Sequence, residues 1–211
     1  MVHWLDQHSA APCEQVYLAD PLRADSGYAV LADRKGGAHF LLIPTRKIAG
    51  IESPELIAPG APNYFAAAWR ASDRLTAAAQ HAIPRNAVGL AVNPARARSQ
   101  DQLHIHIECL RPEVFEALNR NMGRITTSWS PLAIGSSSFW ALKIMGDDLK
   151  DDNPFKLLAD HRPEPRGMMG DYTLVVAGMQ SSSGPGFIVL TSTTAAGELL
   201  LDSTCAAVSV P

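Results

Sequence analysis

Apolar residues along this chain fall in short runs separated by turns rich in Gly and Pro. The first clear run covers 28–32 and the second covers 39–43, which ends at Pro44. Between them, 33–37 contains two consecutive glycines and three charged residues. Two short apolar runs joined by such a turn predict a β-hairpin near the start of the chain.

Helical and extended segments follow one another in the rest of the sequence. Helical spacing and helix-favouring composition predict helices at about 63–80, 112–122 and 153–161. Further apolar runs predict strands at 88–92, 172–177 and 187–191. We therefore expect an α+β fold in which helices pack on an antiparallel sheet.

The most informative run is Gln102–Glu108, which is expected to be a strand. Side chains alternate between the two faces of a strand, so His104, His106 and Glu108 share one face together with Gln102. The intervening residues are all apolar and point into a core. The run therefore predicts a polar face with two imidazoles and a carboxylate above a fully apolar back.

This polar face suits phosphoryl chemistry. One imidazole can attack phosphorus, a neighbouring group can fix its tautomer, and a third can reach the leaving oxygen. Arg96, Arg98 and the Ser99 hydroxyl lie on the preceding loop and are candidates to steady phosphate oxygens.

Three other interpretations remain open for the same residues. The two histidines with Glu108 or Cys109 are also typical metal ligands. They would equally fit a solvated structural face, or a nucleotide-binding module without catalysis.

Composition narrows the class of partner. The chain has 211 residues, of which 46% are hydrophobic and 18% charged, and its formal net charge is −3. Such a balance predicts no broad basic surface, so we expect no nucleic-acid partner. No apolar stretch reaches the length of a transmembrane helix, and the first residues lack the order of a signal peptide, so a soluble chain is expected.

The three cysteines leave two arrangements open. Cys13 and Cys205 lie near opposite ends, where a disulfide would tie the termini to the body of the protein. Three buried thiols are equally compatible with the sequence. No Cys-x-x-Cys pair exists, which argues against a structural zinc site.

Two segments resemble the histidine-triad superfamily of nucleotide hydrolases and transferases. The first is 39–48, with a His followed by an apolar run, Pro and a basic residue. The second places Asn93 after a strand, then Ser99-Gln100, then the alternating His104–Ile107 run. The resemblance implies a HIT-like fold and a covalent intermediate on the middle histidine of the triad.

Longer segments are similar to the bacterial CDP-diacylglycerol pyrophosphatases. These are 27–31, 51–56, 62–65 and 104–112. The resemblance implies hydrolysis of CDP-diacylglycerol, a lipid nucleotide, to CMP and phosphatidate, without a metal or other cofactor. It also implies access to a membrane surface, association with the inner membrane facing the periplasm, and a monomer or homodimer. A soluble dinucleotide or nucleotide sugar is the alternative substrate.

The resemblance also implies roles for individual residues. His106 occupies the middle position and would attack the cytidine-side phosphorus, His104 would orient it, and His39 would support His104. The expected substrate-binding residues are Asn93, Ser99, Gln100, Gln102 and Arg98.

The third position of the triad departs from the superfamily pattern, because Glu108 stands there. A carboxylate beside a phosphate is repulsive unless it is protonated or turned toward an imidazolium. A register shifted by two residues would make Gln102 the first member, His104 the nucleophile and His106 the third. The spacing of Asn93 and Gln100 favours His106.

An internal similarity bears on domain organisation. The run 27–32 resembles 171–177, and each is followed by a loop and an apolar strand. This indicates either a degenerate duplication or two unrelated hairpins. A duplication would divide the chain into a catalytic half, 1–125, and a degenerate half, 126–211.

Overall fold

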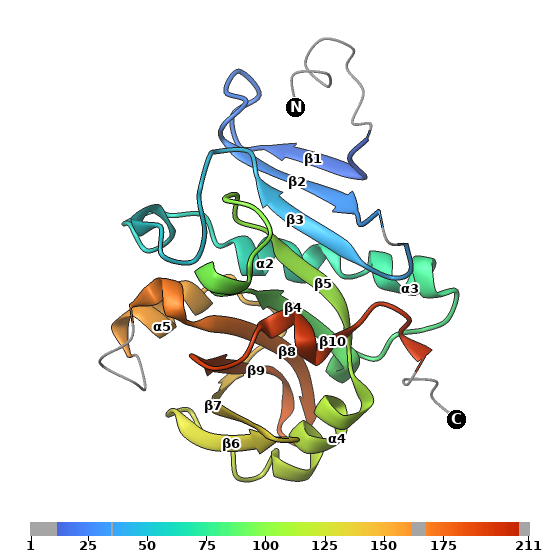
Figure 1. Ribbon diagram of the computed structural model, residues 1–211. Coiled ribbons are helices and arrows are strands. Elements are labelled where there is room, and N and C mark those ends of the chain that lie inside the picture. The colour runs from blue at the N-terminus through green and yellow to red at the C-terminus, as the bar shows by residue number, and fades with distance from the viewer. Residues whose placement is uncertain (1–11, 35, 162–167, 207–211) are drawn as a thin grey trace.

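The computed structural model describes residues 12–34, 36–161 and 168–206. One antiparallel sheet of ten strands forms the body of the molecule (Figure 1). The strands are β1 (Gln15–Leu18), β2 (Gly27–Ala32), β3 (Phe40–Pro44), β4 (Val88–Val92), β5 (Ile105–Leu110), β6 (Ser130–Ile134), β7 (Ser137–Met145), β8 (Thr173–Ser181), β9 (Gly184–Ser192) and β10 (Leu201–Asp202). Their order is β1-β2-β3-β5-β4-β8-β9-β7-β6, and β10 pairs with β5 beside this path.

The helices are short and flank the sheet. They are α2 (Tyr64–Ala71), α3 (Arg74–Ala79), α4 (Pro112–Asn121) and α5 (Pro154–Asp160), with 3-10 turns η1 (Pro54–Leu56), η2 (Arg85–Ala87), η3 (Ala95–Ala97), η4 (Met169–Asp171) and η5 (Gly197–Leu200). Buried residues of α2, α3 and α5 join one apolar core, and those of α4 join a second core on the other face of the sheet. The expected α+β class with an antiparallel sheet is therefore confirmed.

Most predicted elements are present with altered bounds. The hairpin of β2 and β3 is present, with Tyr28 opposite Pro44, and β4 covers the predicted run. The single helix predicted at 63–80 is wrong. Ser72 donates both its N–H and its hydroxyl to the carbonyl of Trp69, which forms a tight turn between α2 and α3.

The strand that carries the histidines starts later than predicted. β5 begins at Ile105, because the preceding backbone is bound elsewhere: Leu103 donates its N–H to the carbonyl of Ile48 at 2.6 Å. Ile105 and Ile107 pack into the core with α2. The predicted alternation holds within β5, so His106 and Glu108 lie on the opposite face.

The C-terminal strap, which we define as residues 197–205, begins against that opposite face, where Gly197 packs on Ala91 and Val175, and continues as β10 edge to edge with β5 (Figure 1). It contains η5 and β10, and Leu201 of β10 pairs with Leu110 of β5. Ser203 accepts a hydrogen bond from the Ala38 N–H at 2.7 Å. The strap therefore brings the end of the chain back to the strand that carries His106.

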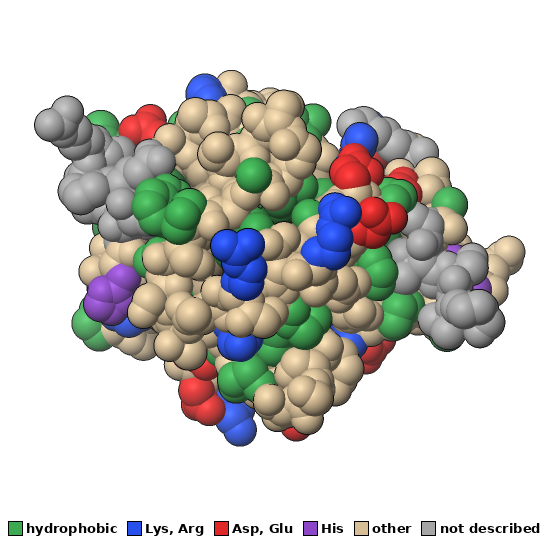
Figure 2. Space-filling view, turned by 90° about the horizontal axis from the view of Figure 1, so that it is seen from below, with side chains coloured by type: hydrophobic (Ala, Val, Ile, Leu, Met, Phe, Trp, Pro, Cys, Tyr) green, Lys and Arg blue, Asp and Glu red, His purple; other side chains and the backbone are tan. Residues whose placement is uncertain are grey.

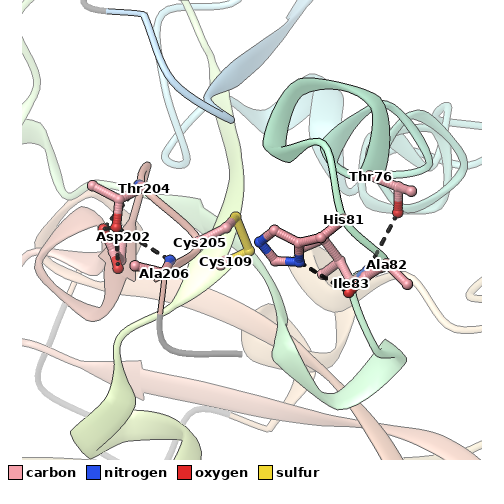
Figure 3. The surroundings of a disulfide bond; sticks show 9 residues. All are labelled: Thr76, His81, Ala82, Ile83, Cys109, Asp202, Thr204, Cys205 and Ala206. Carbon is pink, nitrogen blue, oxygen red and sulfur yellow. Dashed lines mark hydrogen bonds between the residues drawn. A yellow bond between two sulfur atoms is a disulfide. The ribbon is translucent and has the colours of Figure 1, made fainter. Parts of the chain in front are cut away.

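A disulfide anchors the end of the strap. Cys205 bonds to Cys109 of β5, while Cys13 forms no disulfide (Figure 3). Neither arrangement that the sequence left open, a Cys13–Cys205 disulfide or three free thiols, is therefore present. Cys13 precedes β1 at the edge of the sheet, whereas β10 places Cys205 beside β5.

The helices and the surface charge bear on the expected membrane and nucleic-acid partners. Across the described ranges, no helix combines the length and apolarity that crossing a bilayer requires. On the face drawn in Figure 2, Lys and Arg side chains lie apart among uncharged groups, with acidic side chains nearby. That face presents no continuous basic surface.

Candidate active site

A polar cavity of about 250 Å³ lies on the histidine face of the sheet. It is lined by Asp33, His39, Leu41, Asn93, Ala97, Ser99, Gln100, His104, His106 and Glu198. Loops after β2 and β4, the strands β3 and β5, and the C-terminal strap all contribute to it. Six of the residues predicted from the sequence therefore meet around one cavity.

His39, His106 and Glu108 form a compact buried cluster at one side of this cavity. The Nε2 atom of His39 lies 3.1 Å from His106 Nδ1 and 3.2 Å from Glu108 Oε1. His106 Nδ1 and Glu108 Oε1 are 3.8 Å apart. The pairing of β3 with β5, in which Leu41 stands opposite His106, places His39 at the start of β3 beside this cluster.

His39 was expected to support His104, and that role stays a prediction. In the structure, His39 contacts His106 and Glu108, and its Nδ1 atom faces Asp33 Oδ1 at 3.8 Å. Glu108 contacts two imidazoles from behind and does not line the cavity. Its carboxylate is thus turned toward rings that can carry positive charge, which avoids repulsion of a phosphate.

A hydrogen bond to a backbone carbonyl fixes the ring of His104. Its Nδ1 atom lies 2.8 Å from the carbonyl oxygen of Gln102. A carbonyl can only accept, so Nδ1 carries the proton and Nε2 of the neutral ring offers a lone pair. His104 thus presents a fixed tautomer to the cavity that it lines.

Two of the predicted binding residues do not line the cavity. The Gln102 amide donates to the carbonyls of Pro44 and Arg46, both at 3.1 Å. Arg98 bonds to the carboxylates of Glu52 and Asp101 at 2.7–3.0 Å. Burial lowers the pKa of Arg98. The two carboxylates raise this pKa by a larger amount, so it lies above its usual value. Both residues fix the loops around the site.

Asn93, Ser99 and Gln100 do line the cavity, as predicted. The Oδ1 atom of Asn93 also accepts a hydrogen bond from the Glu198 N–H at 3.1 Å. Asn93 therefore lines the cavity and also has a structural role. It ties the C-terminal strap to the end of β4.

Asp33 and Glu198 belong to the site but were not predicted from the sequence. Glu198 Oε2 lies 3.6 Å from His106 Nε2, although the two residues are 92 positions apart in sequence. Neither carboxylate stands in a recognisable motif, so no local signal could have found them. With these two residues included, the cavity wall as described contains two carboxylates and no Lys or Arg.

Comparison with known proteins shows the family of this chain. The sequence model of the family described as CDP-diacylglycerol pyrophosphatase matches residues 2–209. The CDP-diacylglycerol pyrophosphatase of Yersinia pestis is 37% identical, over 96% of this chain and 79% of that protein. The chain belongs to the CDP-diacylglycerol pyrophosphatase family. The expected resemblance to the CDP-diacylglycerol pyrophosphatases is thereby confirmed.

In this member of the pyrophosphatase family, the buried cluster also has the donor set of a metal site. His39, His106 and Glu108 each offer a ligand atom, and these atoms lie within 4.8 Å of one another. Two imidazoles and one carboxylate are ligands that transition metals accept. By the type of its donor atoms, the cluster can therefore serve either in proton transfer or in metal binding.

Proposed function

We propose that this chain hydrolyses the pyrophosphate of CDP-diacylglycerol to CMP and phosphatidate through a nucleotidyl group carried on His106. The observation that carries the proposal is the position of His106. Its Nδ1 atom faces the buried His39–Glu108 pair, while its ring forms part of the cavity wall with Nε2 toward Glu198. Family membership supports this substrate over a soluble dinucleotide or nucleotide sugar.

The contacts of the cluster support one arrangement of its protons. Ionised Glu108 can only accept, so the 3.2 Å contact indicates that His39 donates from Nε2. The same N–H faces His106 Nδ1 at 3.1 Å, which makes Nδ1 the acceptor. The neutral His106 ring then carries its proton on Nε2, the atom on the cavity side.

The reaction then proceeds in two displacements. In the first, His106 Nε2 loses its proton and bonds to the cytidine-side phosphorus, while the bond to the bridging oxygen breaks and its electron pair leaves with phosphatidate. In the second, water attacks the same phosphorus, and the P–N bond breaks with its electron pair returning to Nε2. CMP is released and the ring is restored.

His39 and Glu108 assist the second displacement. For this step His39 is an imidazolium, protonated on Nδ1 toward Asp33 as well as on Nε2. Its Nε2 proton passes to His106 Nδ1 and turns the phosphorylated ring into an imidazolium, which is the better leaving group. Glu108 and Asp33 face His39 and stabilise positive charge within this pair of rings. No metal or other cofactor is used in these steps.

Ser99, Gln100 and His104 complete the proposed substrate contacts. All three line the cavity, and the His104 ring lies edge to face with the His106 ring at 5.1 Å between centroids. Hydroxyl and amide groups donate to phosphate oxygens, and His104 donates from Nε2 when it is protonated.

One observation favours His104 as an alternative nucleophile. Its Nδ1 proton is fixed by the Gln102 carbonyl at 2.8 Å, which leaves Nε2 unprotonated in the neutral ring. We rank His106 first because carboxylates lie near both of its nitrogens, where they stabilise the positive charge that develops on attack.

Trapping of the intermediate tests both assignments. Wild-type protein is mixed with CDP-diacylglycerol in detergent micelles, quenched within milliseconds and digested for mass spectrometry. We expect a cytidylyl group on the peptide at His106, and a loss of hydrolysis of about 10⁴-fold or more in His106→Ala. An adduct on His104 that persists in His106→Ala would select the alternative, and full hydrolysis by both single variants would overturn the mechanism.

We further propose that the fold is HIT-like and consists of two related halves. The order β2-β3-β5-β4 on one side of the sheet is mirrored by β6-β7-β9-β8 on the other, with β4 beside β8. This order matches the first hairpin with β6 and β7, rather than with β8 and β9 as the sequence similarity indicated. Residues 1–125 would form the active half and 126–211 a half without the histidine pair.

Access to the lipid and the location of the protein are also proposals. Leu199 follows Glu198 at the cavity and is 61% exposed, which supports approach to a membrane surface. The Cys109–Cys205 disulfide supports an oxidising compartment such as the periplasm.

A further inference from the structure

We propose that Glu198 is a catalytic residue, the base that removes the Nε2 proton of His106 and handles the same proton in the second displacement. This inference rests on the proposed function, because it requires His106 to attack through Nε2. It begins from the proton assignment above, in which Nε2 of the neutral ring is protonated and cannot attack until that proton leaves.

Glu198 is the carboxylate on the correct side of the ring. Its Oε2 atom lies 3.6 Å from His106 Nε2, whereas Glu108 Oε1 approaches Nδ1. Asp33 faces His39 Nδ1. Within the described wall of the cavity, Glu198 and Asp33 are the carboxylates, and Glu198 is the one that approaches Nε2.

The backbone of Glu198 is fixed while its carboxylate retains freedom. Its N–H donates to Asn93 Oδ1 at 3.1 Å, and the neighbouring Gly197 packs closely on β4 and β8. The side chain is 43% exposed, so a small rotation can shorten the 3.6 Å separation to a hydrogen bond. Such a side chain can meet the imidazole first and a water molecule later.

The proton balance closes over both displacements. In the first, the Nε2 proton moves to Glu198 as the N–P bond forms, and Glu198 then gives it to the departing phosphatidate oxygen. In the second, the Glu198 carboxylate takes a proton from the attacking water. After the P–N bond breaks, that proton returns to Nε2, the Nδ1 proton returns to His39, and the enzyme regains its starting state.

Glu198→Gln tests this role, because the amide keeps the size of the side chain but cannot accept the proton. We expect kcat on micellar CDP-diacylglycerol to fall by about 10²–10⁴-fold with KM changed only a few-fold. In a single turnover, formation of the His106 adduct should slow by the same factor. Added formate should partly restore the rate of Glu198→Ala by replacing the missing carboxylate.

Glu116→Gln on the exposed side of α4 is the matched control and should retain wild-type kinetics. Equal melting temperatures establish that both variants are folded. Wild-type adduct formation with an unchanged rate in Glu198→Gln would overturn this inference and leave the proposed function intact. A lower KM with unchanged kcat would also overturn it, by showing that the carboxylate only repels substrate. No CMP release by the wild type would instead overturn the proposed function itself.

Discussion

At the scale of single residues, the two nitrogens of His106 have different partners and therefore different tasks. Nδ1 lies 3.1 Å from His39, and Nε2 lies 3.6 Å from Glu198. A nucleophile that must first attack and then depart benefits from this separation. A base on the attacking side helps the first displacement, and an acid on the other side helps the second.

His39→Gln separates these two displacements. Glutamine can still donate a hydrogen bond toward Glu108 and His106 but has no proton to transfer. We therefore expect adduct formation to persist while its hydrolysis slows by about 10²–10⁴-fold. Rapid-quench measurements should show one equivalent of phosphatidate released quickly, with CMP appearing slowly.

The opposite kinetic pattern would count against this role of His39. If phosphatidate release slows as much as CMP release, His39 acts mainly by positioning His106. His81→Gln is a suitable control, because His81 lies on the loop after α3, where its Nδ1 atom is 3.2 Å from the carbonyl oxygen of Ala82, and it does not line the cavity.

Residues of the site were predictable where they occurred in a pattern. Period-two alternation identified His104, His106 and Glu108, and a short motif identified His39 and Asn93. Asp33 and Glu198 follow from tertiary packing, so nothing in their local sequence marks them. Gln102 and Arg98 appeared suitable for phosphate, but backbone carbonyls and carboxylates already occupy their donors.

At the scale of secondary-structure elements, the C-terminal strap determines whether Glu198 reaches the histidines. Gly197 packs so closely that an added Cβ would lie 2.5 Å from Thr173 Oγ1 and 3.0 Å from Val175 Cγ2. A side chain at this position must therefore push η5 away from the sheet.

Gly197→Ala should lower kcat because it displaces Glu198. A misplacement of about 1 Å can cost about 10²-fold in rate, so we expect a loss of about 10- to 100-fold. Overpacking should also lower the free energy of unfolding by about 1–3 kcal/mol. Gly123→Ala is the control, since nothing lies within 4 Å of its added Cβ. Equal kinetics of the two variants would show that the strap does not depend on this contact.

Elements were predictable where apolar periodicity was strong. β2, β3, β4, α4 and α5 match their predicted positions within about two residues. β6 and β7 were missed because 124–150 mixes polar and apolar residues without a clear period. β10 has only two residues, and it forms by pairing with β5 rather than through its own propensity.

At the scale of the whole molecule, the site depends on both ends of the described chain meeting on one sheet. The central strands β4 and β8 join the two parts of the sheet, and the strap then returns from the second part to β5. The Cys109–Cys205 disulfide closes this return and spans 96 residues of sequence (Figure 3). A cross-link over such a long loop restricts the unfolded chain strongly.

Cys205→Ser should therefore lower the free energy of unfolding by about 2–5 kcal/mol. Cys13→Ser should change it by less than about 1 kcal/mol, because Cys13 is partly exposed and forms no disulfide. Denaturant melts with and without dithiothreitol check both values, and reduced wild type should match Cys205→Ser. Because the disulfide holds the strap that carries Glu198, Cys205→Ser should also lose activity at temperatures where it remains folded. Equal sensitivity of the two variants, or a wild type indifferent to reductant, would show that the disulfide does not supply this stability.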